Sequence, residues 1–328
     1  MARWRRSRSY RDTVRRRGAV AVDATARVGP IVLPNPIVAA SGTFGHGDEV
    51  ARIADAAGFG AVTTKSLAPY AWPGNEPPRL HPTAAGMLNS VGLQGPGVEP
   101  WVERELPALR ARGARVIASI WGRTVDDYAV ATKMLDDARD DLLAVEVNVS
   151  CPNLEDRARM FAHSCEATAA VTRAVVEHAR ELPVLVKLSP NVTDVRAIAG
   201  AAVDAGATGL TLINTVMGLA VDAQRRRPVL GAGGGGLSGP AIKPIALRVV
   251  ADVARELPSV PIVGTGGVMT GLDAVEMLLA GASAVGVGTA TFRDPRAGLH
   301  IRDQLVAWCA SQGVTRVADL TGRMTWPT

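Results

Sequence analysis

The stretch VEVNVSCPNLED, residues 145 to 156, has the pattern of a buried strand that ends in polar and reactive side chains. Its valines alternate with Glu146, Asn148 and Ser150, and a period of two is typical of a β-strand. If the valines face covering helices, these three polar side chains point to the opposite face, the interior of a barrel. Cys151 follows at the strand end. The stretch therefore predicts a functional site at the carboxyl end of a core strand.

Seven other short apolar runs alternate with longer segments whose apolar residues recur at helical spacing. Eight strands, each followed by a crossover helix, predict an α/β protein with a closed parallel (β/α)8 TIM barrel. We expect this barrel to form one domain over residues 25–328. Beside 142–150, the predicted strands are 37–41, 61–66, 115–120, 184–189, 209–214, 261–267 and 284–290.

The net charge of +5 is concentrated at the N-terminus. Residues 1–17 hold eight arginines and one aspartate, so the rest of the chain carries about −2. Such a basic block is typical of a solvated arm, and residues 1–24 are predicted to be flexible; docking to a membrane surface or a partner is the alternative. Nucleic acid is not an expected partner.

The composition also limits where the protein works. No apolar run is long enough for a membrane span, and no secretory signal is recognisable, so we expect a cytoplasmic protein without a membrane partner. The cysteines, Cys151, Cys165 and Cys309, are odd in number and lack CxxC spacing. Neither a disulfide framework nor a metal site is expected.

Two intervals between predicted strands are too long for simple crossovers. Residues 67–100 are rich in glycine and proline, and residues 215–240 contain the run GAGGGGLSGP. Both follow strand ends, so they are expected on the carboxyl face of the barrel, where active sites form. The glycine run fits a flexible linker equally well.

Lysine is rare in this arginine-rich chain: the four lysines are Lys65, Lys133, Lys187 and Lys243. Lys65 and Lys187 end apolar strands, and parity places Lys187 inside the barrel. A buried ammonium is costly unless it meets an anion or a polarised ligand. The alternative is a side chain that extends out of the barrel mouth.

Glycine pairs occur at the ends of the last two predicted strands, in GTGG (264–267) and GVGT (286–289). Backbone N–H groups at these two positions of a barrel commonly bind phosphate. A phosphate-bearing ligand is therefore predicted.

In a polar loop at the mouth, Cys151 is placed to act as a proton acceptor or nucleophile, whereas Cys165 begins a helical pattern and is expected to be structural.

Several motifs, taken in order, resemble the class 1 dihydroorotate dehydrogenases, and most closely the class 1B catalytic subunit. The resemblance spans about residues 25–295 and is carried by NPIVAASGTFG, TTKS, PGNEPPRL, GMLNSVGLQGPG, EVNVSCPN, VKLSPNVTD, LINTVMGLAVD, GGLSGPAIKPIALR and GTGGVMTGLDAVEMLLAGA. The combination of SCPN, LNSVGLQ and LSGPAIKPIALR is highly specific.

The resemblance implies an FMN enzyme that oxidises dihydroorotate to orotate in pyrimidine biosynthesis, with Cys151 as the base that removes the C5 proton. It also implies two sets of binding residues. The substrate set is Lys65, Asn89, Ser90, Val91, Gly92, Leu93, Asn148, Asn153, Asn214 and Thr215. The FMN set is Ser41, Lys65, Ser66, Ser119, Asn148, Lys187, Ile213, Gly239, Gly266, Gly267, Gly288 and Thr289.

The chain departs from the family pattern at three places. Ser119 stands where an asparagine is common, which predicts a shorter-reaching or water-mediated contact to the flavin. The segment LEDRARMFAHS (154–164) replaces a turn that is often rich in glycine, so the behaviour of this loop over the site is left open. The arginine-rich arm has no counterpart.

The resemblance to class 1B implies a homodimer that works with a second subunit carrying FAD and a [2Fe–2S] cluster, which passes electrons to NAD⁺. The chain itself has no GxGxxG motif and no cysteine cluster for such a role. The alternative within class 1 is a self-sufficient homodimer that reduces fumarate. Two other readings are a flavin dehydrogenase for another reduced pyrimidine and an inactive barrel that binds only a phosphate ligand.

Overall fold

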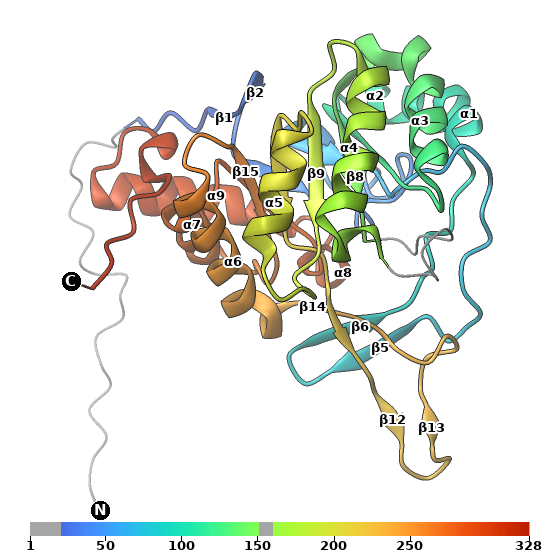
Figure 1. Ribbon diagram of the computed structural model, residues 1–328. Coiled ribbons are helices and arrows are strands. Elements are labelled where there is room, and N and C mark those ends of the chain that lie inside the picture. The colour runs from blue at the N-terminus through green and yellow to red at the C-terminus, as the bar shows by residue number, and fades with distance from the viewer. Residues whose placement is uncertain (1–20, 151–159, 328) are drawn as a thin grey trace, which may run out of the picture.

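The computed structural model describes residues 21–150 and 160–327. Eight parallel strands close into a barrel in the order β3, β4, β7, β8, β9, β10, β15, β16 (Figure 1). The predicted barrel and its eight strands are confirmed, although most strands end earlier than predicted because their last residues turn into the loops. The bounds are β3 Ile37–Ala39, β4 Ala61–Thr63, β7 Val116–Ile120, β8 Leu142–Asn148, β9 Val184–Leu188, β10 Gly209–Leu212, β15 Ile262–Thr265 and β16 Ala284–Val287.

Helices cover the outside of the barrel, but the first crossover differs from the prediction. Between β3 and β4 the chain forms only a 3-10 turn, Ala56–Gly58, in place of an α-helix. In the next crossover, a π-helical segment, Trp101–Glu105, joins two of the helices. The α-helices are α1 Val98–Pro100, α2 Leu106–Ala111, α3 Val125–Met134, α4 Cys165–Ala179, α5 Val195–Asp204, α6 Lys243–Glu256, α7 Gly271–Ala280, α8 Ala290–Arg293 and α9 Ala297–Gln312. No helix in the described ranges is long and apolar enough to cross a membrane.

The amino end of the barrel is closed by apolar packing. Strands β1 (Ala26–Val28) and β2 (Ile31–Leu33) form an antiparallel hairpin. Their buried side chains pack with the barrel-lining Val38, Ile117 and Leu185. Because described apolar side chains fill this end, the cavity found among the described residues opens at the carboxyl end.

The two long intervals form a second sheet on the carboxyl face. Its order is β11 (Val216–Gly218), β14 (Gly235–Ser238), β6 (Gly86–Asn89) and β5 (Leu80–Thr83). The short hairpin of β12 (Val221–Asp222) and β13 (Arg227–Pro228) projects on the same side of the molecule as β5 and β6 (Figure 1). The predicted position of both intervals is confirmed, but the strands in them were not predicted.

The end of the glycine run in the second interval belongs to the paired strand β14, so the interpretation of that part as a flexible linker is wrong. Gly236 pairs with Asn89 across β14 and β6. A Cβ at Gly235 would lie 2.5 Å from the Asn89 carbonyl oxygen, and one at Gly236 would overlap the Thr215 side chain. Glycine is needed here because the backbones approach too closely for a side chain.

Candidate active site

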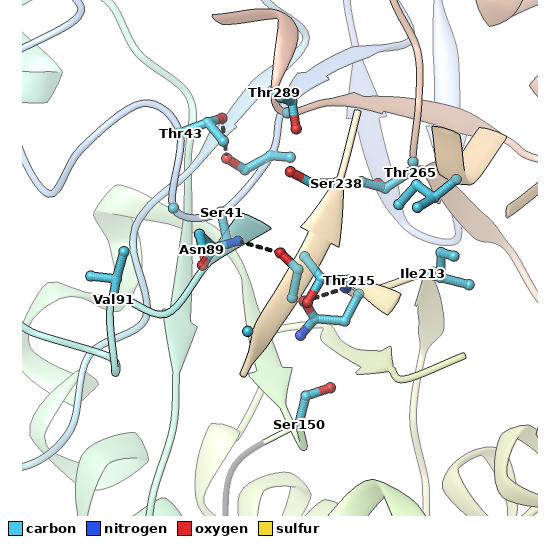
Figure 2. A pocket seen from close by; sticks show the side chains of 18 of the residues that line it. Ser41, Thr43, Asn89, Val91, Ser150, Ile213, Thr215, Ser238, Thr265 and Thr289 are labelled. Carbon is cyan, nitrogen blue, oxygen red and sulfur yellow. Dashed lines mark hydrogen bonds between the residues drawn. The ribbon is translucent and has the colours of Figure 1, made fainter. Parts of the chain in front are cut away.

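A cavity of about 770 Å³ opens among the carboxyl ends of the barrel strands and the second sheet. Its size is typical of a site for a cofactor or a small ligand. In Figure 2, Thr43 and Thr289 lie at one edge of the cavity and Ser150 at the opposite edge. The predicted site residues that line it are Ser41, Lys65, Ser66, Asn89, Ser90, Val91, Gly92, Leu93, Asn148, Lys187, Ile213, Asn214, Thr215, Gly239, Gly266, Gly267, Gly288 and Thr289.

Three predicted site residues remain to be placed, and the structure describes only one of them. Cys151 and Asn153 lie outside the described residues. Ser119 is fully buried, and its hydroxyl is 2.8 Å from the Ser66 hydroxyl, which does reach the cavity. The Ser119 side chain thus meets the cavity only through Ser66.

Asn148 joins the ends of three barrel strands. Its Nδ2 donates to the Ser66 hydroxyl at 3.3 Å, and its Oδ1 accepts from Asn214 Nδ2 at 3.2 Å. The Ser150 backbone N–H donates to the same Oδ1 at 3.2 Å, and the Tyr128 hydroxyl donates to the Asn148 carbonyl at 2.8 Å. These bonds fix the orientation of the amides, which can then both donate to and accept from a planar polar ligand.

The segment 89–93 enters the cavity from β6. The Asn89 side chain donates to the Gly236 carbonyl at 3.3 Å, which ties β6 to β14. Leu93 adopts a φ of 60°, an uncommon conformation for a residue other than glycine. Arg79 holds this turn in place, because its guanidinium donates to the carbonyls of Pro73 and Asn75 and to the Gln94 side chain.

Lys187 projects into the barrel from β9, next to Asn148 on β8. It is only 7% exposed, and no described residue forms a hydrogen bond or ion pair with its ammonium group. The alternative in which Lys187 extends out into solvent is therefore wrong. A buried ammonium without a partner among these residues favours an anionic or polarised ligand in the cavity.

Lys65 is the second ammonium at the cavity, and its surroundings are also poorly solvated. Burial, and then the charge of Arg79, lower the pKa of Lys65 from its ordinary value. The neighbouring His46 has a pKa lowered to about 4, first by burial and then by the charge of Lys65. His46 Nε2 is buried and has no hydrogen-bond partner in the described part of the chain.

On the opposite side of the cavity, glycine backbone lies among the side chains of Thr265, Val268 and Thr289. Gly267 adopts a φ of 75°, and a Cβ there would lie 2.7 Å from the Lys243 backbone nitrogen. A Cβ on Gly288 would meet nothing closer than 3.8 Å among the described residues, so this glycine leaves open space. The turn after β15 and the start of α8 therefore form a concave backbone surface of the kind that receives phosphate.

Some cavity residues were missed by the sequence analysis, and Asn191 is the best connected of them. Its Nδ2 donates to the Ser189 hydroxyl and to the Thr215 carbonyl, both at 2.9 Å. Its Oδ1 accepts from the Met217 backbone N–H at 2.8 Å. The motif VKLSPN contained the signal, since Asn191 follows the strand that carries Lys187. Its partners could not be predicted because they lie in another loop.

Comparison with known proteins agrees with this geometry. The family model described as dihydroorotate dehydrogenase matches residues 24–308. The chain belongs to the dihydroorotate dehydrogenase family. This match covers the whole barrel and both cavity-lining intervals, so the resemblance predicted from the motifs is confirmed.

Individual relatives cover nearly the whole chain. The chain is 45% identical over 303 residues to the catalytic subunit of dihydroorotate dehydrogenase B (NAD(+)) from Alkaliphilus metalliredigens, covering 92% of this chain and 99% of the relative. The corresponding subunit from Geobacter sulfurreducens is 44% identical over 302 residues, with 92% and 98% covered. A relative from Solibacter usitatus, named for dihydroorotate dehydrogenase A (fumarate), is 46% identical over 294 residues, with 90% and 96% covered.

Proposed function

We propose that this chain oxidises (S)-dihydroorotate to orotate in pyrimidine biosynthesis, with FMN as its bound cofactor. The observation that carries the proposal is one cavity with two unlike sides, in a barrel of the dihydroorotate dehydrogenase family. One side is glycine backbone around Gly267 and Gly288, and the other is a cluster of amides and lysines around Asn148 and Lys187. The first side suits a phosphate, and the second suits a flavin ring stacked with a planar carboxylate substrate.

The residues present fit FMN. Open space beside Gly288 and the backbone turn at Gly267 leave room for a phosphate. Lys187 is buried at the carboxyl end of β9 and lines the cavity, where its ammonium can neutralise negative charge on a bound ring system. When bound, FMN supplies an acceptor for the hydride that leaves C6 of the substrate.

The protein's own part in the chemistry is binding and proton removal. The amides of Asn89, Asn148 and Asn214 can hydrogen-bond the substrate ring, and the ammonium of Lys65 can pair with the substrate carboxylate. Cys151 is proposed as the base that takes the C5 proton, which the adjacent ring carbonyl makes acidic. Ammonium groups near a thiol favour the thiolate form that such a base requires.

We propose NAD⁺ as the final electron acceptor, reached through a separate subunit that carries FAD and a [2Fe–2S] cluster. The names of the Alkaliphilus and Geobacter relatives support this choice. Fumarate is the second candidate, because the Solibacter relative of similar identity is named for it. We further propose that the chain forms a homodimer and works in the cytoplasm.

The proposal is tested by the visible spectrum of the purified protein. A flavin spectrum that bleaches on addition of dihydroorotate, and not of dihydrouracil, is the expected result. A colourless protein that does not take up FMN contradicts the proposed cofactor, and bleaching by dihydrouracil alone contradicts the proposed substrate. Reoxidation by fumarate, without any second subunit, contradicts the proposed acceptor.

A further inference from the structure

Lys243 lies just behind the glycine side of the cavity, at the first position of α6. It does not line the cavity, although its neighbour Ile242 does. The turn that follows β15 rests against it, since a Cβ on Gly267 would lie 2.5 Å from the Lys243 Cβ. The backbone of Lys243 therefore supports the part of the cavity wall proposed to receive the phosphate.

The Lys243 side chain continues from this support to the start of α7. Its Nζ lies 2.6 Å from Asp273 Oδ1 and 2.7 Å from Glu276 Oε2. Asp273 also caps α7: its Oδ2 accepts from the backbone N–H groups of Met269 and Thr270, at 2.9 and 2.8 Å. Because Met269 lines the cavity, one chain of contacts joins α6, the glycine turn and α7.

The charges in this group have a clear consequence for a bound anion. The hydrogen bonds that Lys243 donates to Asp273 and Glu276 raise the pKa of Lys243. Burial alone would raise the pKa of Asp273, but Lys243 and the N–H of Met269 bring it below its ordinary value. Without the ammonium, the two carboxylates behind the cavity wall would lose their neutralising cation, and they would repel a phosphate more strongly.

We propose that Lys243 is a positioning residue for the phosphate of the bound cofactor: it holds the turn at Gly267 and neutralises Asp273 and Glu276. The inference rests on the proposed function, since it takes FMN to be the ligand. Lys243 acts through the backbone and the carboxylates and does not touch the ligand itself.

Binding of FMN and of riboflavin to the apoprotein tests this role, because riboflavin lacks the phosphate. Quenching of flavin fluorescence gives both dissociation constants. Lys243→Met is expected to weaken FMN binding roughly fivefold to tenfold and to change riboflavin binding less than about twofold. The FMN-specific loss should shrink as the salt concentration rises, because salt screens the repulsion. Lys133→Met is the matched control, since Lys133 is exposed on α3, and it should leave both constants unchanged.

A second variant keeps the test decisive if Lys243→Met does not fold. Glu276→Gln removes one of the two carboxylates and leaves the Lys243 to Asp273 pair intact. It should tighten FMN binding about twofold and leave riboflavin binding unchanged. Equal losses for FMN and riboflavin in Lys243→Met, or no gain for FMN in Glu276→Gln, would overturn the inference. Failure of the unchanged apoprotein to bind FMN would instead overturn the proposed function.

Discussion

The two sides of the cavity are built on different physical principles. On the glycine side, the surface offered to a ligand includes the backbone of Gly266, Gly267 and Gly288, and the packing of α6 and α7 behind it fixes its shape. On the amide side, the surface is made of side chains from β8, β9, β10 and the second sheet, which hydrogen bonds hold in orientation. The first side can bind an anion but has no group suited to proton transfer among the residues described. The second side has the amide and ammonium groups that could bind and polarise a substrate.

This difference predicts that mutations can affect cofactor binding and catalysis separately. A change on the glycine side should reduce the affinity for the cofactor and leave the chemistry of the remaining bound fraction intact. A change on the amide side should impair flavin reduction or substrate binding and leave the affinity for the cofactor intact. The predictions below test this separation, from the largest expected effect to the smallest.

The largest effect is expected from Cys151→Ala, which removes the proposed base of the amide side. FMN should stay bound, while reduction of the flavin by dihydroorotate slows by on the order of 10² or more. Single-turnover absorbance measurements check this. Cys165→Ala is the matched control, because Cys165 is an exposed free cysteine at the start of α4. An unchanged rate of reduction in Cys151→Ala would remove this residue from its role.

Gly267→Ala should give the opposite phenotype. The added Cβ would lie 2.5 Å from the Lys243 Cβ, at a residue with a φ of 75°. Strain of about 1–3 kcal/mol, together with a displaced turn, should weaken FMN binding by at least about tenfold. Gly313→Ala is the control for the backbone conformation alone. Gly313 has a φ of 74°, and a Cβ added there would meet no described atom within 4 Å. Equal FMN affinity in both variants would refute the steric argument.

The two sides also differ in how far they could be predicted from sequence. The glycine pairs at the strand ends are a local signal in the sequence, and the parity of β8 and β9 placed Asn148 and Lys187 correctly in the barrel. The partners of Asn191 and the sheet of β5, β6, β11 and β14 could not be predicted, because they depend on contacts between segments far apart in the chain, such as the 147 residues that separate Asn89 from Gly236. Short glycine-rich strands such as β14 carry no apolar alternation, so the glycine run resembled a linker.

Lowering the pH should first destabilise the part of the amide side around Lys65, because the buried His46 lies beside it. The pKa of His46 in the folded chain is about 4, against an ordinary value of 6.5, so the unfolded chain binds a proton at higher pH. Stability should therefore fall as pH drops from 6.5 towards 4. From pH 7 to pH 4, the unfolding free energy should fall by about 1–3 kcal/mol more in the wild type than in His46→Gln.

Urea unfolding at several pH values measures this difference, and His300→Gln is the control because His300 is exposed. If wild type and His46→Gln lose stability in parallel over this range, His46 is not the group responsible. Because His46 also lies close to Lys65, an acid-induced change should reach the amide side before the glycine side.

The smallest effect is expected from Asn191→Ala, which tests whether the hydrogen-bond network of the amide side matters as well as the groups that it holds. Without Asn191, the Thr215 carbonyl and the Met217 N–H lose their partner. The loop that carries Asn214 should then lose its fixed orientation, and the affinity for orotate should fall about tenfold, which corresponds to about 1.4 kcal/mol. FMN affinity should change less than about twofold, since the glycine side is not touched.

Perturbation of the flavin spectrum by orotate measures this affinity. Asn35→Ala is the control: Asn35 is equally an internal amide, 5% exposed, but it donates to the Gly58 carbonyl away from the cavity. It should lower stability and leave orotate binding unchanged. Parallel losses of FMN and orotate affinity in Asn191→Ala would mean that the two sides respond as one unit, and the separation between backbone and side-chain recognition would not hold.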